Sequence, residues 1–172
     1  MKKIILLGYM GCGKSTIAKT LSKKLQLPFV DLDDYIIEKS KMSIQTIFEE
    51  LGEIQFRKME HEALIALLAL DQTIIIGLGG GTPCYANNHE LLKAEHVESV
   101  YLKASIATLF ERLFTNKSKR PLIAHMDQEQ MKEFIATHLF ERSYFYNQAK
   151  HIVSVDEKSV EQTVLDIEAV LA

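Results

Sequence analysis

Five short apolar runs recur along the chain, and stretches with helical periodicity separate them. The first run, Ile4–Leu7, consists of β-branched and leucine residues and stops at Gly8. A continuous apolar run of this length predicts a strand that is buried on both faces. The other predicted strands are Phe29, Val30 and Leu32; Thr73–Ile76; Ser99–Leu102; and Ile152–Val155.

Between these runs, apolar residues recur three or four positions apart, which is the spacing of a helix with one buried face. Lys14–Leu25 shows this pattern most clearly. Ser43 and Gly52 have the residue types of caps at the two ends of a helix over Ile44–Leu51. Ser159–Gln162 has the pattern of a capping box and opens the last predicted helix. The other predicted helical stretches are Ile36–Glu38, Glu53–Leu70, Asn88–His96, Ser105–Phe114 and Gln128–Ala149.

Strands that alternate with helices indicate an α/β protein with three layers, in which a five-stranded parallel sheet is covered on both faces. The length of 172 residues fits one domain, residues 1–172, and the chain contains no internal repeat or low-complexity tract. One segment has no clear periodicity. Thr115–Asp127 is polar and basic, and we expect it to be a mobile loop.

Composition excludes several classes of protein. Apolar residues make up 47% of the chain and charged residues 25%, which is typical of a globular domain and excludes disorder. The net charge of −3 provides no basic field for nucleic acid. Two cysteines, Cys12 and Cys84, form no disulfide framework and suit a reducing compartment. No stretch approaches the ~20 apolar residues of a membrane span. We therefore expect a cytoplasmic protein without a membrane or nucleic-acid partner.

Seven of the eight glycines fall in two clusters, each directly after a predicted strand. The first cluster reads Gly8-Tyr-Met-Gly-Cys-Gly-Lys14-Ser15 and matches the P-loop pattern, with a strand before it and a helix after it. Glycines in such a loop let backbone N–H groups turn toward phosphates, while the helix N-terminus adds positive potential. Lys14 is expected to reach the β- and γ-phosphates of ATP, and Ser15 is expected to bind Mg²⁺.

Other nucleotide-binding classes fit less well. The third glycine of a dinucleotide fingerprint would fall on Thr16, and the chain has no Asn-Lys-x-Asp run of a GTPase. A single domain with a basic loop favours a kinase of a small molecule.

The second cluster consists of Gly77 and the run Gly79–Gly81 at the end of the third strand, and Asp31 and Asp33 lie at the C-terminal end of the second. Ligands of open α/β sheets bind at the carboxyl ends of the strands, so these residues are candidates for metal and acceptor binding. The alternative interpretation is that Asp33 and Asp34 form an N-cap pair for the next helix. The chain has sixteen lysines and four arginines, Arg57, Arg112, Arg120 and Arg142. Scarce arginines are candidates for two-bonded contacts to carboxylate or phosphate, although Arg57 also suits an ion pair with Glu53 or Glu60.

These features together resemble the shikimate kinase family over nearly the whole chain. The matching motifs are Gly8-x-Met-Gly-x-Gly-Lys-Ser-Thr16, Phe29-x-Asp31-x-Asp33, Ile47-Phe-x-x-x-Gly52-Glu-x-x-Phe56-Arg57, Gly79-Gly-Gly81, Arg120-Pro-Leu and Arg142-x-x-x-Tyr146-x-x-Ala149. The resemblance implies a P-loop fold with strand order 2-3-1-4-5. It also implies transfer of the γ-phosphoryl group of ATP to the 3-hydroxyl of shikimate, with Mg²⁺ as cofactor and a monomeric enzyme.

The resemblance also implies a role for each candidate residue. Lys14, Asp33 and Arg120 would be catalytic, Ser15 would bind Mg²⁺ directly and Asp31 through water. The lid would cover about residues 115–127, and the acceptor-binding helical segment about residues 33–61. The ATP site would comprise Gly11, Cys12, Gly13, Lys14, Ser15, Thr16, Arg112, which would stack on adenine, and Arg120. The shikimate site would comprise Asp33, Arg57, Gly79, Gly80, Gly81 and Arg142.

Two alternatives remain open at the level of the sequence. The first is a P-loop kinase of another small substrate, such as gluconate or a nucleoside monophosphate. The second is an ATP-binding relative without catalysis, although Lys14, Ser15, Asp33 and Arg120 are all present.

Overall fold

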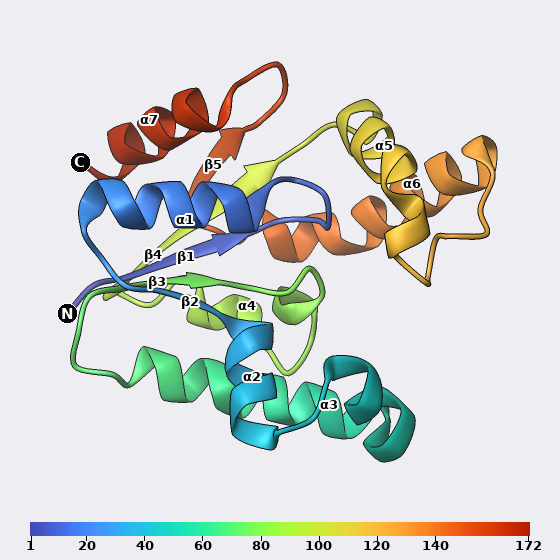
Figure 1. Ribbon diagram of the computed structural model, residues 1–172. Coiled ribbons are helices and arrows are strands. Elements are labelled where there is room, and N and C mark those ends of the chain that lie inside the picture. The colour runs from blue at the N-terminus through green and yellow to red at the C-terminus, as the bar shows by residue number, and fades with distance from the viewer.

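A parallel sheet of five strands forms the centre of the protein, and helices cover both of its faces (Figure 1). The structure is a computed structural model that describes residues 1–172. The strands lie in the order β2-β3-β1-β4-β5, which confirms the predicted fold class and the strand order implied by the resemblance. Their bounds are β1 (Lys3–Leu7), β2 (Phe29–Asp31), β3 (Ile74–Gly77), β4 (Val97–Lys103) and β5 (His151–Ser154).

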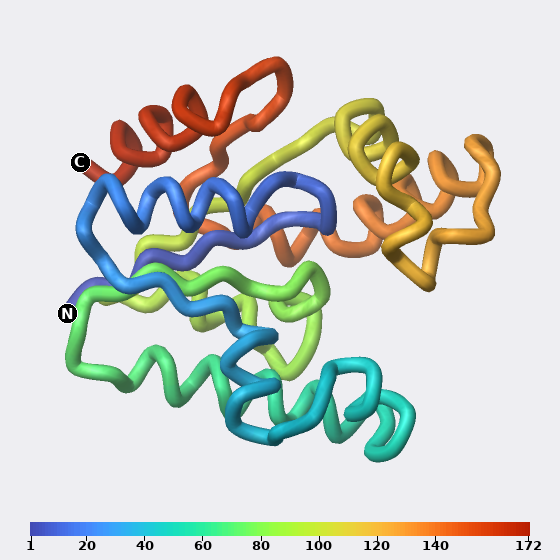
Figure 2. The backbone as a smooth tube through the Cα atoms, viewed as in Figure 1, coloured from blue at the N-terminus to red at the C-terminus, as the bar shows by residue number.

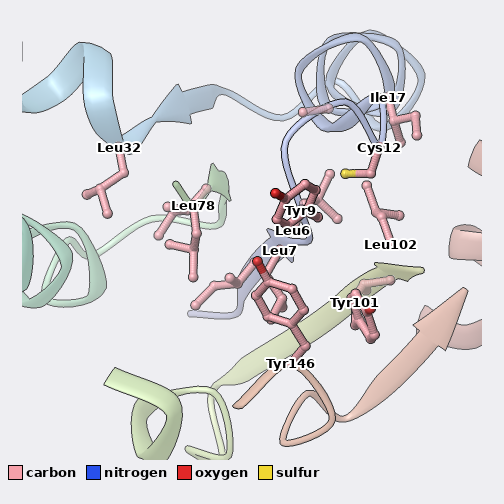
Figure 3. Packing of buried hydrophobic residues seen from close by; sticks show 14 of the residues in the cluster. Leu6, Leu7, Tyr9, Cys12, Ile17, Leu32, Leu78, Tyr101, Leu102 and Tyr146 are labelled. Carbon is pink, nitrogen blue, oxygen red and sulfur yellow. The ribbon is translucent and has the colours of Figure 1, made fainter. Parts of the chain in front are cut away.

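Strand β1 occupies the middle of the sheet. Lys3 pairs with Ile74 of β3 on one side and with Val97 of β4 on the other. All five residues of β1 are buried, as expected for a parallel strand covered on both faces. Its apolar side chains join one cluster of 36 buried apolar residues, part of which Figure 3 shows around Leu6 and Leu7. The continuous apolar runs of the sequence therefore correspond to the inner strands.

Helices α1 and α7 lie together on one face of the sheet, and α3 and α4 lie on the other (Figure 1). No helix is both long enough and apolar enough to span a membrane. The helical bounds are α1 (Lys14–Leu25), α2 (Leu32–Ser40), α3 (Ile44–Leu68), α4 (Asn88–Leu91), α5 (Ile106–Thr115), α6 (Gln128–Tyr146) and α7 (Val160–Leu171), with 3₁₀ turns η1 (Thr82–Cys84) and η2 (Lys117–Lys119).

Several predicted elements differ in extent from the structure: the helix predicted at Ile36–Glu38 spans Leu32–Ser40, the strand predicted at Ser99–Leu102 spans Val97–Lys103, and α6 ends at Tyr146 rather than Ala149. Leu32 does not belong to the second strand but begins α2, because the Asp31 carboxylate accepts hydrogen bonds from the backbone N–H groups of Asp33 and Asp34 and caps the helix there. The predicted helix over Asn88–His96 ends at Leu91. The chain then forms tight turns, in which the N–H of Ala94 bonds to the carbonyl of Leu91.

The stretches predicted as separate helices on either side of Gly52 form one element, α3, with a kink. Gly52 has φ 80° and ψ 168°, which is not helical, so its predicted role as a break is correct although the helix resumes directly after it. A positive φ of this size suits glycine because a side chain would be strained there. The kink separates the first two turns of α3 from the long remainder.

Two parts of the chain project beyond the carboxyl end of the sheet (Figure 2). One is the beginning of α3, and the other consists of α5, the following loop and the beginning of α6. The loops that follow β1, β2 and β3 reach the same end. The fold therefore brings both glycine clusters and the acidic cluster to one edge.

Candidate active site

The first glycine cluster forms a tight loop between β1 and α1. Gly11 and Gly13 have φ values of 84° and 90°, and a β-carbon on Gly11 would lie 3.0 Å from the Leu113 side chain. Lys14 begins α1, and its ammonium group donates a 2.9 Å hydrogen bond back to the carbonyl oxygen of Gly8. The lysine is thus held over a loop whose backbone and helix N-terminus favour an anion.

A cleft of about 420 Å³ lies between this loop, the end of β2 and the second glycine cluster. It brings together most of the residues predicted from the sequence. Its lining comprises Tyr9, Met10, Gly11, Gly13, Lys14, Ser15, Thr16, Asp31, Asp33, Leu78, Gly79, Gly80, Arg112 and Arg120. Cys12, predicted to contact ATP, is only 1% exposed and points into the core, so this residue can face the cleft only through its backbone.

Asp31 and Asp33 differ in what surrounds their carboxylates. The N-cap of α2 is Asp31 and not the predicted pair Asp33 and Asp34, whose backbone N–H groups donate to the Asp31 carboxylate. Asp33 is the second residue of α2, in its first turn, and it lines the cleft. Burial raises the pKa of Asp33 to about 6, helped by Asp31 and Glu60 and opposed by Lys14. A carboxyl group with such a pKa in a cleft is a candidate for proton transfer.

Each glycine of the run Gly79–Gly81 lies next to one predicted acceptor-binding side chain. A β-carbon on Gly79 would lie 3.5 Å from Oδ1 of Asp33. One on Gly80 would lie 3.2 Å from Nη1 of Arg142, and one on Gly81 would lie 3.0 Å from Nη2 of Arg57. The three glycines therefore leave bare backbone close to a carboxylate and two guanidinium groups. That arrangement suits a small anion with hydroxyl groups.

The structure places Arg57 in a buried ion pair that sequence analysis did not assign to the site. Nη1 of Arg57 donates a 2.9 Å hydrogen bond to Oε1 of Glu60, and the guanidinium lies 3.8 Å from the ring centre of Tyr85. Glu60 is only 1% exposed, and its other oxygen accepts a 2.7 Å hydrogen bond from Thr82. The pairing of Arg57 with Glu60 thus exists, but inside the protein, where it fixes the arginine. In the sequence, the only signal for this ion pair is that Glu60 follows Arg57 by three residues, which places both on one face of a helix.

The remaining two arginines flank the phosphate-binding loop. Nη1 of Arg112 donates a 3.3 Å hydrogen bond to the carbonyl oxygen of Gly11. Arg112 also lines a smaller cavity of about 140 Å³, opposite Val155 and Lys158. Arg120 is exposed and reaches the main cleft from the segment after α5. The lid motion predicted for residues 115–127 remains a prediction.

The oxygen groups in the cleft fit a magnesium ion. Oδ1 of Asp31 accepts two backbone hydrogen bonds, and neither is made to Oδ2. The Ser15 hydroxyl lies in the same cleft. No group of three or more His, Cys, Asp or Glu side chains could enclose a metal ion. Mg²⁺ is commonly held by one or two protein oxygens together with waters and phosphates, so this sparse donor set is suitable.

Known proteins resemble the chain over its full length. The shikimate kinase family model matches residues 10–172. A shikimate kinase of Flavobacterium johnsoniae is 62% identical over 172 residues, which are 100% of both chains. The crystal structure of shikimate kinase from Bacteroides thetaiotaomicron has a TM-score of 0.89 at 33% identity and covers 99% of this chain and 98% of its own.

A further solved structure is shikimate kinase from Acinetobacter baumannii in complex with shikimate. It has a TM-score of 0.85 at 27% identity and covers 99% of this chain and 93% of its own. Fold, cleft and sequence therefore lead to the same conclusion: the chain belongs to the shikimate kinase family.

Proposed function

We propose that the protein transfers the γ-phosphoryl group of ATP to the 3-hydroxyl of shikimate. The observation that carries this proposal is the placement of Gly79, Gly80 and Gly81 beneath Asp33, Arg142 and Arg57, beside a complete phosphate-binding loop. The cleft suits a triphosphate, and the region next to it at Gly80 and Gly81, where Arg142 and Arg57 lie, suits a hydroxylated carboxylate. The Acinetobacter baumannii relative, whose structure contains shikimate, supports this choice of acceptor.

The acceptor binds through its carboxylate and its ring hydroxyls in this proposal. Arg57 and Arg142 hold the carboxylate by charge-assisted hydrogen bonds, which are stronger than neutral ones. Glu60 keeps Arg57 in place through the 2.9 Å hydrogen bond. The bare backbone of the glycine run lets the ring approach closely. Asp33 accepts a hydrogen bond from the 3-hydroxyl.

ATP binds in the cleft itself. Backbone N–H groups of Gly11 to Thr16 surround the phosphates, and the Lys14 ammonium moves from the Gly8 carbonyl to the β- and γ-phosphates. Arg120 neutralises charge on the transferred group. Arg112 stacks on adenine, which would occupy the cavity opposite Val155 and Lys158.

The reaction step depends on Asp33. As the 3-oxygen attacks the γ-phosphorus and the bond to the bridging oxygen of ADP breaks, the hydroxyl proton passes to the Asp33 carboxylate. Lys14 and Arg120 stabilise the charge that spreads over the phosphoryl oxygens. Ser15 directly and Asp31 through water would hold Mg²⁺, which when bound neutralises the phosphates and orients them.

We also propose how the whole chain is organised as an enzyme. Residues 1–172 act as one kinase domain, in which residues 33–61 contact the acceptor and residues 115–127 close over the phosphates. The protein works as a cytoplasmic monomer without a nucleic-acid or membrane partner.

An ADP-release assay tests this function. Purified protein with ATP and Mg²⁺ should release ADP when shikimate is added and should be inactive with gluconate or nucleoside monophosphates. The Lys14→Ala variant should retain less than a tenth of the turnover, while Lys19→Ala, an exposed lysine on the same helix, should keep it. Turnover with gluconate but not with shikimate contradicts the proposal. ATP binding without turnover on any acceptor indicates a non-catalytic relative.

A further inference from the structure

Tyr9 connects the phosphate-binding loop to helix α6. It follows Gly8 directly at the end of β1, is 1% exposed, and borders the main cleft. Its hydroxyl group lies 2.9 Å from Nδ1 of His138. The Arg142 guanidinium lies 5.5 Å from the centre of the Tyr9 ring. One tyrosine thus contacts both a histidine and an arginine of α6.

His138 and Arg142 are four residues apart on α6, so their side chains lie on the same face of the helix. The His138 ring also packs against Phe134, with ring centres 4.2 Å apart, one turn before it. This packing leaves His138 little freedom to leave Tyr9. The rings of Tyr9, His138 and Phe134 and the guanidinium of Arg142 therefore form one contiguous group. We call its three polar members the Tyr9–His138–Arg142 cluster.

The direction of the hydrogen bond follows from the chemistry of the two rings. Burial raises the pKa of Tyr9 to about 12, opposed by Arg142, so the phenol keeps its proton at neutral pH and donates it. Neutral His138 then accepts at Nδ1 and carries its own proton on Nε2. Burial lowers the pKa of His138, Arg142 lowers it further, and Glu141 opposes the shift. Glu133, His138 and Glu141 line one groove on the surface of α6. Protonated His138 has no lone pair on Nδ1 and cannot accept the hydrogen bond.

The position of Arg142 relative to the acceptor site gives the cluster its role. A β-carbon added to Gly80 would lie 3.2 Å from Nη1 of Arg142. It would also lie 3.7 Å from the carbonyl oxygen of Gly8 and 3.7 Å from the backbone nitrogen of Met10. The phosphate-binding loop, the glycine run and Arg142 therefore meet at Tyr9. A shift of the Tyr9 ring would leave the guanidinium without support on the side facing the loop.

We propose that Tyr9 and His138 are positioning residues that hold Arg142 in the acceptor site and join that site to the phosphate-binding loop. This inference rests on the proposed function, in which Arg142 binds the carboxylate of the acceptor. The hydrogen bond from the Tyr9 hydroxyl to the His138 imidazole fixes the Tyr9 ring. The Tyr9 ring in turn supports the Arg142 guanidinium by a cation–π contact. Neither residue touches the reacting atoms.

Steady-state kinetics of Tyr9→Phe and His138→Leu test the proposal. Tyr9→Phe keeps the ring beneath Arg142 and removes only the hydroxyl. Loss of one net hydrogen bond predicts a rise of about 3- to 10-fold in the KM for shikimate in each variant, larger than any change in kcat or in the KM for ATP. The double variant should match the single ones, because all three lose the same hydrogen bond. Tyr144→Phe and His96→Leu are the matched controls at exposed positions.

A pH profile separates positioning from simple packing. The ratio of the shikimate KM of His138→Leu to that of the wild type should be about 3 to 10 at pH 8. It should fall toward one as the pH drops below the pKa of His138, because the wild type then loses the same hydrogen bond. His138→Gln offers an amide oxygen that accepts from Tyr9 but does not titrate, so it should restore a low KM. A ratio that stays constant with pH overturns the proposal.

Two further outcomes are decisive. Tyr9→Phe with a shikimate KM within 1.5-fold of the wild type overturns the proposal, as does a double variant whose effect is the product of the single ones. Arg142→Lys distinguishes this failure from failure of the proposed function. If Arg142→Lys raises the shikimate KM but Tyr9→Phe does not, only the positioning role is wrong. If Arg142→Lys also leaves the KM unchanged, the acceptor site itself is misassigned. Calorimetric titration with ATP verifies that each variant is folded.

Discussion

The hydroxyl group of Tyr146 donates a 2.6 Å hydrogen bond to the carbonyl oxygen of Gly80. Tyr146 is fully buried at the end of α6, and Gly80 is the middle residue of the glycine run. The bond therefore fixes a part of the acceptor site that has no side chain of its own.

Tyr146→Phe should weaken both stability and acceptor binding. Removal of the Tyr146 hydroxyl takes one hydrogen bond from the half-buried Gly80, and a net hydrogen bond contributes about 0.5–1.5 kcal/mol. We expect a decrease of that size in the free energy of unfolding and a rise of several-fold in the KM for shikimate. Chemical denaturation and initial rates measure the two effects. A variant that loses stability but keeps its KM would limit Tyr146 to a structural role.

Asp33→Asn should slow turnover by about 10²–10⁴-fold, because the amide cannot take the proton of the acceptor hydroxyl. In the wild type, kcat/KM should fall as the pH drops through about 6, where the Asp33 carboxylate becomes protonated. Rates measured between pH 5 and pH 8 would show this limb, and it should be absent from the residual activity of the variant. An unchanged kcat at saturating shikimate would make Asp33 a structural residue only.

The same substitution should stabilise the fold at neutral pH. The pKa of Asp33 in the folded protein, about 6, lies above its ordinary value of 3.8, so the folded state binds the proton more tightly than the unfolded chain does. Ionised Asp33 therefore destabilises the folded state fully above pH 6, and this cost disappears as the pH falls from 6 toward 4. Asp33→Asn should raise the free energy of unfolding by about 1–3 kcal/mol at pH 8 and by little at pH 4. Urea denaturation at both values tests the sign.

Arg57→Lys should raise the KM for shikimate about 10- to 100-fold and leave the KM for ATP nearly unchanged. Lysine keeps the positive charge but lacks the planar guanidinium, which can donate to Glu60 and to the carboxylate of the acceptor at the same time. The matched control is Lys93→Arg, an exposed lysine whose ion pair with Glu90 survives the change. A shikimate KM within twofold of the wild type for Arg57→Lys would show that Arg57 acts only as a point charge.

Hydrogen exchange of residues 115–127 should slow when a non-hydrolysable ATP analogue and shikimate are both bound. The segment is mostly exposed, but the Ile123 side chain is fully buried and anchors it near its middle. Arg120 lies on the cleft side and would close onto the phosphates. Residues 165–171 at the end of α7 line neither the main cleft nor the cavity assigned to adenine, and they serve as the internal control. Equal exchange of the segment in the free and bound protein would make it an ordinary surface loop.

The sequence was sufficient for most of the fold because its local signals agree with one another. The inner strands are continuous apolar runs, and the P-loop pattern identifies which run leads into the first helix. Leu32 was misplaced because its apolar side chain suits a strand or a helix equally, and the deciding group is the side chain of its neighbour Asp31. The short α4 was overestimated because an apolar period cannot show where turns of the 3₁₀ type begin.

The parts of the site that sequence reasoning missed depend on contacts between distant segments. The sequence spacing offers Glu60 as an ion-pair partner of Arg57, but only its burial against Arg57 and Thr82 shows that it supports the site. Tyr9 falls at a variable position of the P-loop pattern, and its partner His138 comes from a helix far along the chain. Such pairs require the three-dimensional arrangement.

The central position of β1 has a consequence for biosynthesis. Strand β1 is made before both of the strands that flank it, so Lys3 must wait for Ile74 and Val97 to be made. Until then an apolar strand with two open edges is exposed to solvent, and pairing across such sequence separations slows folding. The nascent chain should therefore depend on chaperones more than the same fold would if it were circularly permuted to begin between α3 and β3, so that β3 and β4 are made before β1.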